Sequence, residues 1–348
     1  MPGPGEGSMR LNTAWKLVLV SIALVVAGGA SAASIDKVGP IQTDPGLGCS
    51  LYLGGDIGPG DAEALRRLLD DEISRVSNYP DFTVDRQIVL CLESQGGSYI
   101  EALDMATLVF DRDVTTRILP SGTCLSACAL VFMGGNLNTR SGEGWRSSRY
   151  MHPTSRLGFH APALTLPPGA FDRDDVQAAY AVAIEATGRL LSDAHQLRLP
   201  LILIESMFTH RGDDFHYVTT IGEVARYGIK LYGYAAPPTT QASVAHACWN
   251  AWNWSTRGNE QPVTAQAYQA MAADFRMQGA LFVFSPFDGW ALCKHETIML
   301  GGGPKDHVVQ SQSEDLSDPM IDTYWPSWIR LPGPSPLTAL RDGPVRDF

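Results

Sequence analysis

Apolar positions in the first two thirds of the chain change their period from one segment to the next. They recur at helical spacing over residues 61–76, and residues 99–111 predict a second helix. Between these helices, residues 87–92 (QIVLCL) form a continuous apolar run, which is typical of a strand buried on both faces of a parallel sheet. Strands that alternate with helices in this way predict an α/β fold.

The same pattern predicts further elements on both sides of this unit. A short strand that ends in glycines is expected within residues 49–58, and two more strands within 115–119 and 157–160. A glycine turn leads into a small apolar helix over 122–133, and a long helical stretch covers 171–197. These elements extend the predicted α/β domain to about residue 234.

The pattern changes after residue 234. Residues 235–238 (AAPP) are typical of a linker, and residues 240–295 carry aromatic residues at helix-compatible positions before a β-like run at 280–284. Seven prolines from residue 301 onward predict an extended tail. We therefore divide the chain into five parts: a signal peptide (1–33), a linker (34–47), an α/β domain (48–234), a C-terminal subdomain (235–300) and a Pro/Gly-rich tail (301–348).

The N-terminus has the parts of an export signal. Arg10 and Lys16 precede an apolar run at 17–27, and the small residues at 30–32 (ASA) fit the rule for signal cleavage. An uncleaved membrane anchor is the alternative, although the run is short for a full span. Both interpretations place the body outside the cytoplasm, so we expect a periplasmic or secreted protein.

Composition and charge exclude several classes of protein. Hydrophobic residues make up 45% of the 348 residues, which is enough for a packed core. The net charge is −11 and no stretch concentrates Lys and Arg, so binding to nucleic acid is not expected. Trp249, Trp252 and Trp254 are therefore predicted to pack a satellite core rather than to stack bases.

Six cysteines follow the signal segment, an even number that suggests disulfides in an exported protein. Cys248 and Cys293 lie in the same C-terminal block and are expected to pair. Cys49 and Cys91 pair if their strands are neighbours. Six cysteines permit 15 pairings, so these are predictions from position.

Metal-binding patterns are lacking in the sequence. There is no C-x-x-C, and no Cys/His group at zinc spacing. His295 and Glu296 begin like a zinc-binding helix, but Met299 stands where the second histidine would be. We expect neither a metal nor another cofactor.

Three separate segments carry residues suited to catalysis. Residues 94–97 (SQGG) form a glycine turn after a buried strand, where backbone N–H groups can approach a ligand. Residues 122–129 (GTCLSACA) place Ser126 where a helix begins, in the field of the helix N-terminus. Residues 153–162 (PTSRLGFHAP) place His160 at the end of an apolar strand. Each segment alone also has an ordinary structural explanation, such as an N-cap for Ser126.

Together these segments resemble the proteolytic subunit of Clp proteases, within the crotonase-like superfamily. The family has a Ser-Pro-Gly-Gly turn, a helix that opens with Gly-x-x-x-Ser-x-x-Ala, and then Pro-x-Ser-Arg-x-x-x-His-x-Pro. The resemblance covers about residues 48–232. Within the family, the chain most resembles exported relatives whose helix begins with Cys-x-Ser-Ala-Cys. The resemblance implies a spiral of β-β-α units and leaves assembly into homo-oligomers open. The block from residue 235 has no counterpart in the family, so we expect it to form a small C-terminal helical/β extension.

The resemblance also implies site residues. Ser126 matches the nucleophile and His160 the general base. Asp214 matches the acid that orients the imidazole, with Asp213 as the alternative, because the spacing from here to the following Tyr-Gly run is longer than in the family. A serine hydroxyl needs such a base, and the base needs a group that fixes its tautomer.

Two backbone amides complete the implied site. Gly97, the second glycine of the turn, and Ala127, which follows the nucleophile, match the donors of an oxyanion hole. The expected function is that of an exported serine peptidase-like hydrolase acting on peptides or unfolded polypeptides. An exported protein meets no ATP-driven unfoldase, so no ATPase partner is expected.

Departures from the family keep other interpretations open. Gln95 replaces the proline of the turn, and a polar insertion lies around 138–149. A disulfide between Cys124 and Cys128 would bracket the nucleophile and could distort its turn; otherwise these residues remain thiols. The main alternative is a catalytically inactive Clp protease-fold binding or scaffold protein.

Two other enzymatic interpretations are less favoured. A crotonase-type acyl-thioester enzyme would need coenzyme A, which exported compartments lack. A Ser–Lys dyad would need a buried lysine, and Lys230 is the only lysine in the resembling region.

Overall fold

The computed structural model describes most of the chain after residue 32. The described ranges are 33–39, 48–77, 87–139, 144–162, 172–256, 264–274, 276–278, 281–284, 291–300, 303–311, 316 and 319–346. The predicted export signal lies outside them, apart from residue 33. Within these ranges no helix is both long and apolar enough to cross a membrane.

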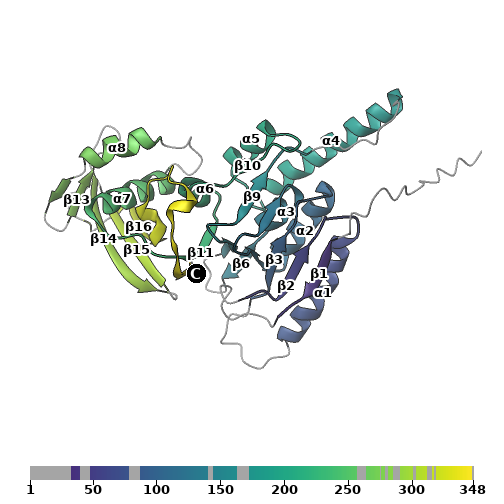
Figure 1. Cartoon of the computed structure of the whole chain (residues 1–348), viewed down its shortest axis with the longest axis horizontal. Coiled ribbons are helices and arrows are strands. Elements are labelled where there is room, and N and C mark those ends of the chain that lie inside the picture. The colour runs from purple at the N-terminus through teal and green to yellow at the C-terminus, as the bar shows by residue number, and fades with distance from the viewer. Residues whose placement is uncertain are drawn as a thin grey trace, which may run out of the picture. The chain divides into compact units, whose positions relative to one another are not determined.

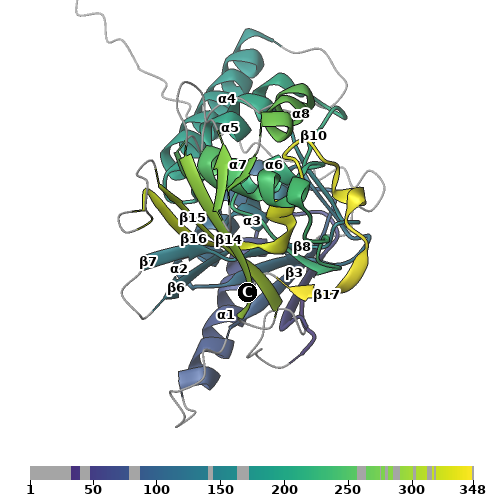
Figure 2. The same ribbon diagram turned by 90° about the vertical axis from the view of Figure 1, so that its left-hand side faces the viewer.

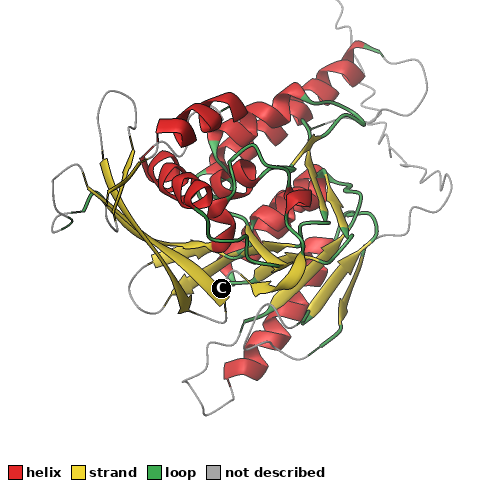
Figure 3. Cartoon of the chain, turned by 60° about the vertical axis from the view of Figure 1, so that its left-hand side comes forward, coloured by secondary structure: helices red, strands yellow, loops and turns green. Residues whose placement is uncertain are grey.

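A seven-stranded mixed sheet forms the centre of the α/β domain (Figure 1). Its five inner strands run parallel, and its two edge strands are antiparallel to their neighbours. Helices and strands alternate along this part of the chain, so the predicted α/β class is confirmed (Figure 3). In spatial order the strands are β1 (Ser34–Lys37), β2 (Leu51–Gly54), β3 (Val89–Glu93), β4 (Thr115–Ile118), β8 (Arg149–Met151), β11 (Lys230–Tyr234) and β17 (Asp342–Arg346).

A second sheet has three strands, which are interspersed along the chain with strands of the first sheet. It has the order β10 (His216–Tyr217), β9 (Arg156–Phe159), β5 (Thr123–Leu125). Two units, β4–β5–α3 and β8–β9–α4, each give one strand to each sheet. In each unit the helix follows the two strands, as α3 (Ala127–Met133) or α4 (Arg173–Ala194). The chain thus repeats a β-β-α pattern.

The two predicted helices are observed as α1 (Asp61–Ser77) and α2 (Tyr99–Asp111), within one residue of the ranges that the sequence predicts. The hydroxyl of Ser98 caps α2 by accepting from the amide of Glu101. Helix α2 lies beside α3, and seven of its residues are buried (Figure 1). Removing one such side chain, as in Leu103→Ala, would cost about 2–5 kcal/mol of stability.

The polar insertion expected around residues 138–149 contributes regular structure. Strands β6 (Asn136–Thr139) and β7 (Gly144–Ser147) pair as an antiparallel ribbon, and β8 then enters the central sheet. Arg149 on β8 is fully buried, and its guanidinium donates to the carbonyls of Leu197 and Tyr227. Burial lowers the pKa of Arg149 to about 9. A buried charged residue therefore links β8 to two distant segments of the core. The polar pattern of this segment gave no indication of that burial.

The C-terminal part forms a five-stranded antiparallel sheet with α7 (Gln241–Thr256) against it (Figure 2). Trp249, Trp252 and Trp254 on α7 are buried, so the prediction that they pack in a core is confirmed; this core is continuous with that of the α/β part and is not a separate satellite. The remaining helix is α8 (Ala265–Asp274). The strands are β12 (Arg276–Gln278), β13 (Leu281–Phe284), β14 (Ala291–Leu300), β15 (Gly303–Ser311) and β16 (Ile321–Pro326).

The extended tail predicted from residue 301 onward is not observed in the described residues. Strands β15 and β16 continue the C-terminal sheet, and β17 adds an antiparallel edge to the central sheet. Three prolines, Pro332, Pro334 and Pro336, lie between two short 3₁₀ helices, η1 (Ser327–Arg330) and η2 (Leu337–Ala339). Three others, Pro304, Pro326 and Pro344, lie within β15, β16 and β17. Likewise, β1 forms part of the predicted 34–47 linker.

All six cysteines are paired. The disulfides Cys49–Cys91 and Cys248–Cys293 form as predicted, because β2 and β3 are neighbours and α7 packs on β14. The third disulfide joins Cys124 to Cys128, which the sequence left open.

Candidate active site

The glycine turn after β3 is tied to the strand that carries the serine segment. Ser94 donates its amide to the carbonyl of Thr123 (2.9 Å) and accepts from the amide of Leu125 (3.1 Å). Its hydroxyl also accepts from the amide of Gly96 (3.0 Å). These bonds hold the turn against β5, so two segments about thirty residues apart meet here.

Both glycines of this turn adopt backbone conformations that other residues rarely tolerate. Gly96 has φ +119° and Gly97 has φ +136°. A Cβ on Gly96 would lie 2.7 Å from Cβ of Ser126, and a Cβ on Gly97 would lie 2.1 Å from the carbonyl oxygen of Ile57. The turn therefore approaches the serine more closely than any side chain would permit.

Ser126 lies between the end of β5 and the start of α3. Its φ of 56° and ψ of −123° are unusual for a residue with a side chain. It takes the N-cap position of α3, but its side chain makes no capping hydrogen bond. Instead, Oγ lies 2.5 Å from Nε2 of His160. The hydroxyl is thus directed to the histidine and away from the helix amides.

His160 follows β9 directly. The amide of Ser126 donates to the carbonyl of Gly158 on the same strand (2.9 Å), which brings the two segments into register. The ring of Phe215 packs on the imidazole, with centroids 4.6 Å apart. Sequence reasoning gave Phe215 no role, because the short strand β10 that follows it and pairs with β9 was not predicted.

The predicted acid does not reach the histidine in this structure. Asp213 and Asp214 are exposed and lie in a turn closed by the bond from the amide of Asp214 to the carbonyl of Arg211 (3.1 Å). Nδ1 of His160 is buried and has no hydrogen-bond partner among the described residues. The reason is register: β10 pairs antiparallel with β9, so the aromatic ring of Phe215, and not a carboxylate, faces the imidazole.

The amides of Gly97 and Ala127 are free to act as donors. In the parallel bridge between Ile57 and Gly97, Ile57 bonds to the carbonyl of Gly96 and the amide of Ser98. The N–H of Gly97 consequently points away from Ile57. Ala127 is the first residue of α3, where amides lack intrahelical acceptors. Neither amide has a backbone acceptor within the described residues.

These groups suit nucleophilic attack, but the histidine lacks a hydrogen-bond partner at Nδ1 among the described residues. When Nε2 accepts from the serine hydroxyl, Nδ1 of His160 carries the proton. That buried N–H then lacks an acceptor, which costs about 1–3 kcal/mol. A carboxylate at this position would fix the tautomer. Among the described residues, the ring is held by packing against Phe215 and by its contact with Ser126.

The lysine considered for a dyad lies elsewhere. Nζ of Lys230 is 3.2 Å from the hydroxyl of Tyr150 in the central sheet, whereas Oγ of Ser126 contacts Nε2 of His160. His160 is therefore the side chain that contacts the hydroxyl of Ser126.

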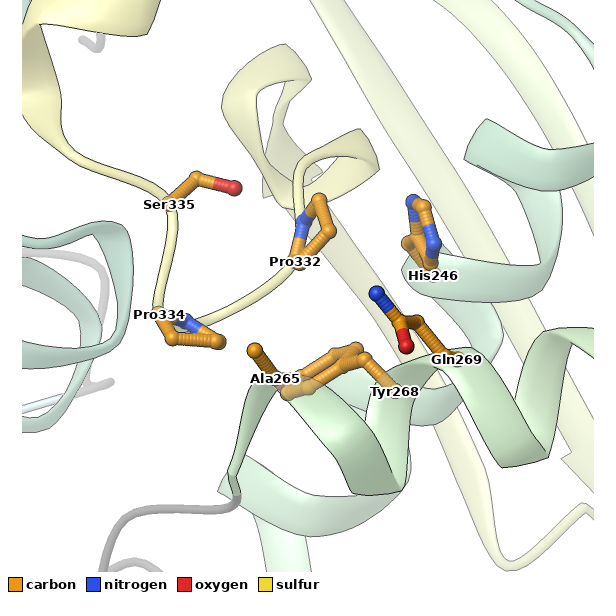
Figure 4. Close-up of a pocket in the computed structure, with 7 residues that line it drawn as sticks. All are labelled: His246, Ala265, Tyr268, Gln269, Pro332, Pro334 and Ser335. Atoms are coloured by element: carbon orange, nitrogen blue, oxygen red, sulfur yellow. The ribbon is translucent and has the colours of Figure 1, made fainter.

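Two hollows lie apart from these residues. One, of about 400 Å³, lies between α7, α8 and the segment 332–335 (Figure 4). The other, of about 260 Å³, is lined by residues of α5 (Leu201–Thr209), β10 and α6 (Ile221–Arg226), with Tyr227. No group of three or more His, Cys, Asp or Glu among the described residues could hold a metal ion.

Comparison with known proteins adds no further assignment. No protein-family model matches the chain, and no curated protein matches its sequence. The resemblance to Clp protease subunits consequently depends on the three motifs and on how the chain brings them together.

Proposed function

We propose that the protein is a serine hydrolase that cleaves peptide bonds, with Ser126 as nucleophile and His160 as general base. The observation that carries this proposal is the 2.5 Å contact between Oγ and Nε2 at a serine whose hydroxyl caps no helix amide. Structural serines at a helix start usually bond to those amides. The unusual backbone of Ser126 is also typical of nucleophiles on strand-to-helix turns.

The reaction follows from the positions of these groups. Nε2 of His160 takes the proton of Ser126 as Oγ attacks the peptide carbonyl, and the N–H groups of Gly97 and Ala127 stabilise the oxyanion. The protonated imidazole then gives its proton to the leaving amine. Water, deprotonated by the same ring, hydrolyses the acyl-enzyme and restores the serine. Neither Asp213 nor Asp214 has a step in this scheme.

The β-β-α repeats support a Clp protease-like architecture. Units β4–β5–α3 and β8–β9–α4 supply the nucleophile and the base from equivalent places, at the ends of the second strands. This is the arrangement that the resemblance implies for a spiral of such units.

The compartment narrows the substrate class. Three disulfides indicate an oxidising, extracellular-type environment. We infer export to the periplasm or medium. Coenzyme A esters are not available there, whereas peptides are, which favours a peptidase over a thioester enzyme.

An inactive binding or scaffold protein is the second candidate. The unpartnered Nδ1 of His160 favours it, because removing the orienting acid of a triad lowers kcat by about 10⁴-fold.

Active-site labelling separates these two candidates. We expect the mature, oxidised protein to react with a fluorophosphonate probe, with the adduct mapped to Ser126. Ser126→Ala and His160→Ala should abolish labelling while leaving the circular dichroism spectrum unchanged. If the wild-type protein stays unlabelled over a range of pH, the hydrolase proposal is wrong and the scaffold is favoured.

A further inference from the structure

The disulfide Cys124–Cys128 encloses the nucleophile. Cys124 lies on β5 and Cys128 is the second residue of α3, so the bridge joins the two elements on either side of Ser126. Both cysteines are fully buried. The sequence interpretation allowed that such a bridge distorts the turn, yet Ser126 still contacts His160 with the bridge in place.

The backbone at Ser126 needs an external restraint. Its φ of 56° is disfavoured for a residue with a Cβ, and such conformations persist only where the surroundings enforce them. One restraint is the bond from its amide to the carbonyl of Gly158. A second is the bond from the amide of Ala129 to the carbonyl of Ser126 (2.9 Å). Helix α3 is buried and packs on β5 and α2, and the disulfide adds a covalent link between β5 and α3 on either side of Ser126.

We propose that the Cys124–Cys128 disulfide is a positioning device for catalysis, which holds Ser126 in the strained conformation that aims Oγ at His160. This inference builds on the proposed function. The bridge spans only four positions, so it restricts the unfolded chain little. Its main effect is on the folded turn.

The disulfide Cys49–Cys91 provides a matched control in the same domain. It is a covalent bridge of the same kind, but it spans 42 positions and joins the strand region of β2 to β3. A longer loop constrains the unfolded chain more strongly. Removing the two bridges should therefore have different effects. Loss of Cys124–Cys128 should change the geometry of the site, and loss of Cys49–Cys91 should lower the stability of the fold.

The test compares C124A/C128A with C49A/C91A. For C124A/C128A we expect the maximal rate of fluorophosphonate labelling to fall by about 100-fold, as for a misplaced nucleophile, with the affinity for the probe unchanged. We expect C49A/C91A to lower Tm more than C124A/C128A does, and to be labelled at the wild-type rate while folded. C124S/C128S serves as a second variant with closer side-chain volume.

A crystal structure of C124A/C128A gives a readout that does not depend on activity. We expect the distance from Oγ to Nε2 to exceed the hydrogen-bond limit of about 3.2 Å. If this distance is kept and labelling stays within about twofold of wild type, the bridge has no positioning role. If neither C124A/C128A nor C124S/C128S folds, the Cys124–Cys128 bridge is required for the fold as a whole and the proposal is overturned. Failure of wild-type labelling would instead reject the hydrolase function, and the crystallographic distance would still decide the role of the bridge.

Discussion

The groups around the two ring nitrogens of His160 differ in how firmly the fold positions them. On the Nε2 side, backbone bonds from Ser94 and Ser126 and a disulfide fix the serine against the imidazole. On the Nδ1 side, no hydrogen-bond partner is found among the described residues; the ring of Phe215 packs on the imidazole, and the turn at 211–214 that carries the aspartates is exposed. The nucleophile is thus placed by the sheet, whereas the acid would have to be placed by a loop.

This difference suggests which part of a serine-hydrolase site depends on the strands. Strand pairing sets positions to within one residue, because a slip reverses the direction of every side chain. A turn beyond the end of a strand has no such restraint. The variants below test whether the strongly held side carries the chemistry, starting with the largest expected effect.

The largest effect is expected for Gly97→Ala, on the strongly held side. Its Cβ would meet the carbonyl oxygen of Ile57 at 2.1 Å, so the turn must move and its N–H must leave the oxyanion position. Loss of one such donor lowers kcat by about 10²–10³-fold. Labelling kinetics measure the loss.

Gly58→Ala is the matched control for this variant, since a Cβ there has nothing within 4 Å. Labelling should stay near the wild-type rate. Equal losses in the two variants would show that the glycine turn has no specific function.

A smaller effect is expected for Phe215→Ala, on the weakly held side. The ring packs on His160 at 4.6 Å, and an aromatic pair of this kind contributes about 0.5–1.5 kcal/mol. We expect labelling to slow by roughly tenfold, because the imidazole gains freedom. Phe215→Leu should recover part of the rate. A rate unchanged in Phe215→Ala would mean that Ser126 alone holds the ring.

The smallest effect is expected for Asp214→Asn. The carboxylate is exposed and does not bond to Nδ1 of His160, so the rate should stay within about threefold of wild type. Asp213→Asn should behave alike. A drop of about 10³-fold or more in either variant would show that the turn closes onto the histidine in the reacting enzyme, which would restore the predicted triad.

Much of the architecture could be predicted from local pattern. The apolar run at 87–92 became a buried strand of the central sheet, and helical spacing placed α1 and α2 closely. Strand β8 was not predicted, because an arginine such as Arg149 usually indicates a surface position. Its carbonyl partners, which allow it to be buried, come from distant parts of the chain. The tail was misjudged because its prolines suggested a lack of structure, although three of them lie within the paired strands β15, β16 and β17 and three lie between the two 3₁₀ helices.

Residue type and spacing alone determined which groups could do chemistry: a serine at a helix start, a histidine after a strand, and a glycine turn, together with an even set of cysteines. Only the tertiary structure decided which of them meet. It joined Ser126 to His160 through strand pairing and closed the Cys124–Cys128 bridge. It also left Asp213 and Asp214 in solvent, because strand register turned Phe215 to the imidazole. Register depends on pairing between distant segments, which no local pattern encodes.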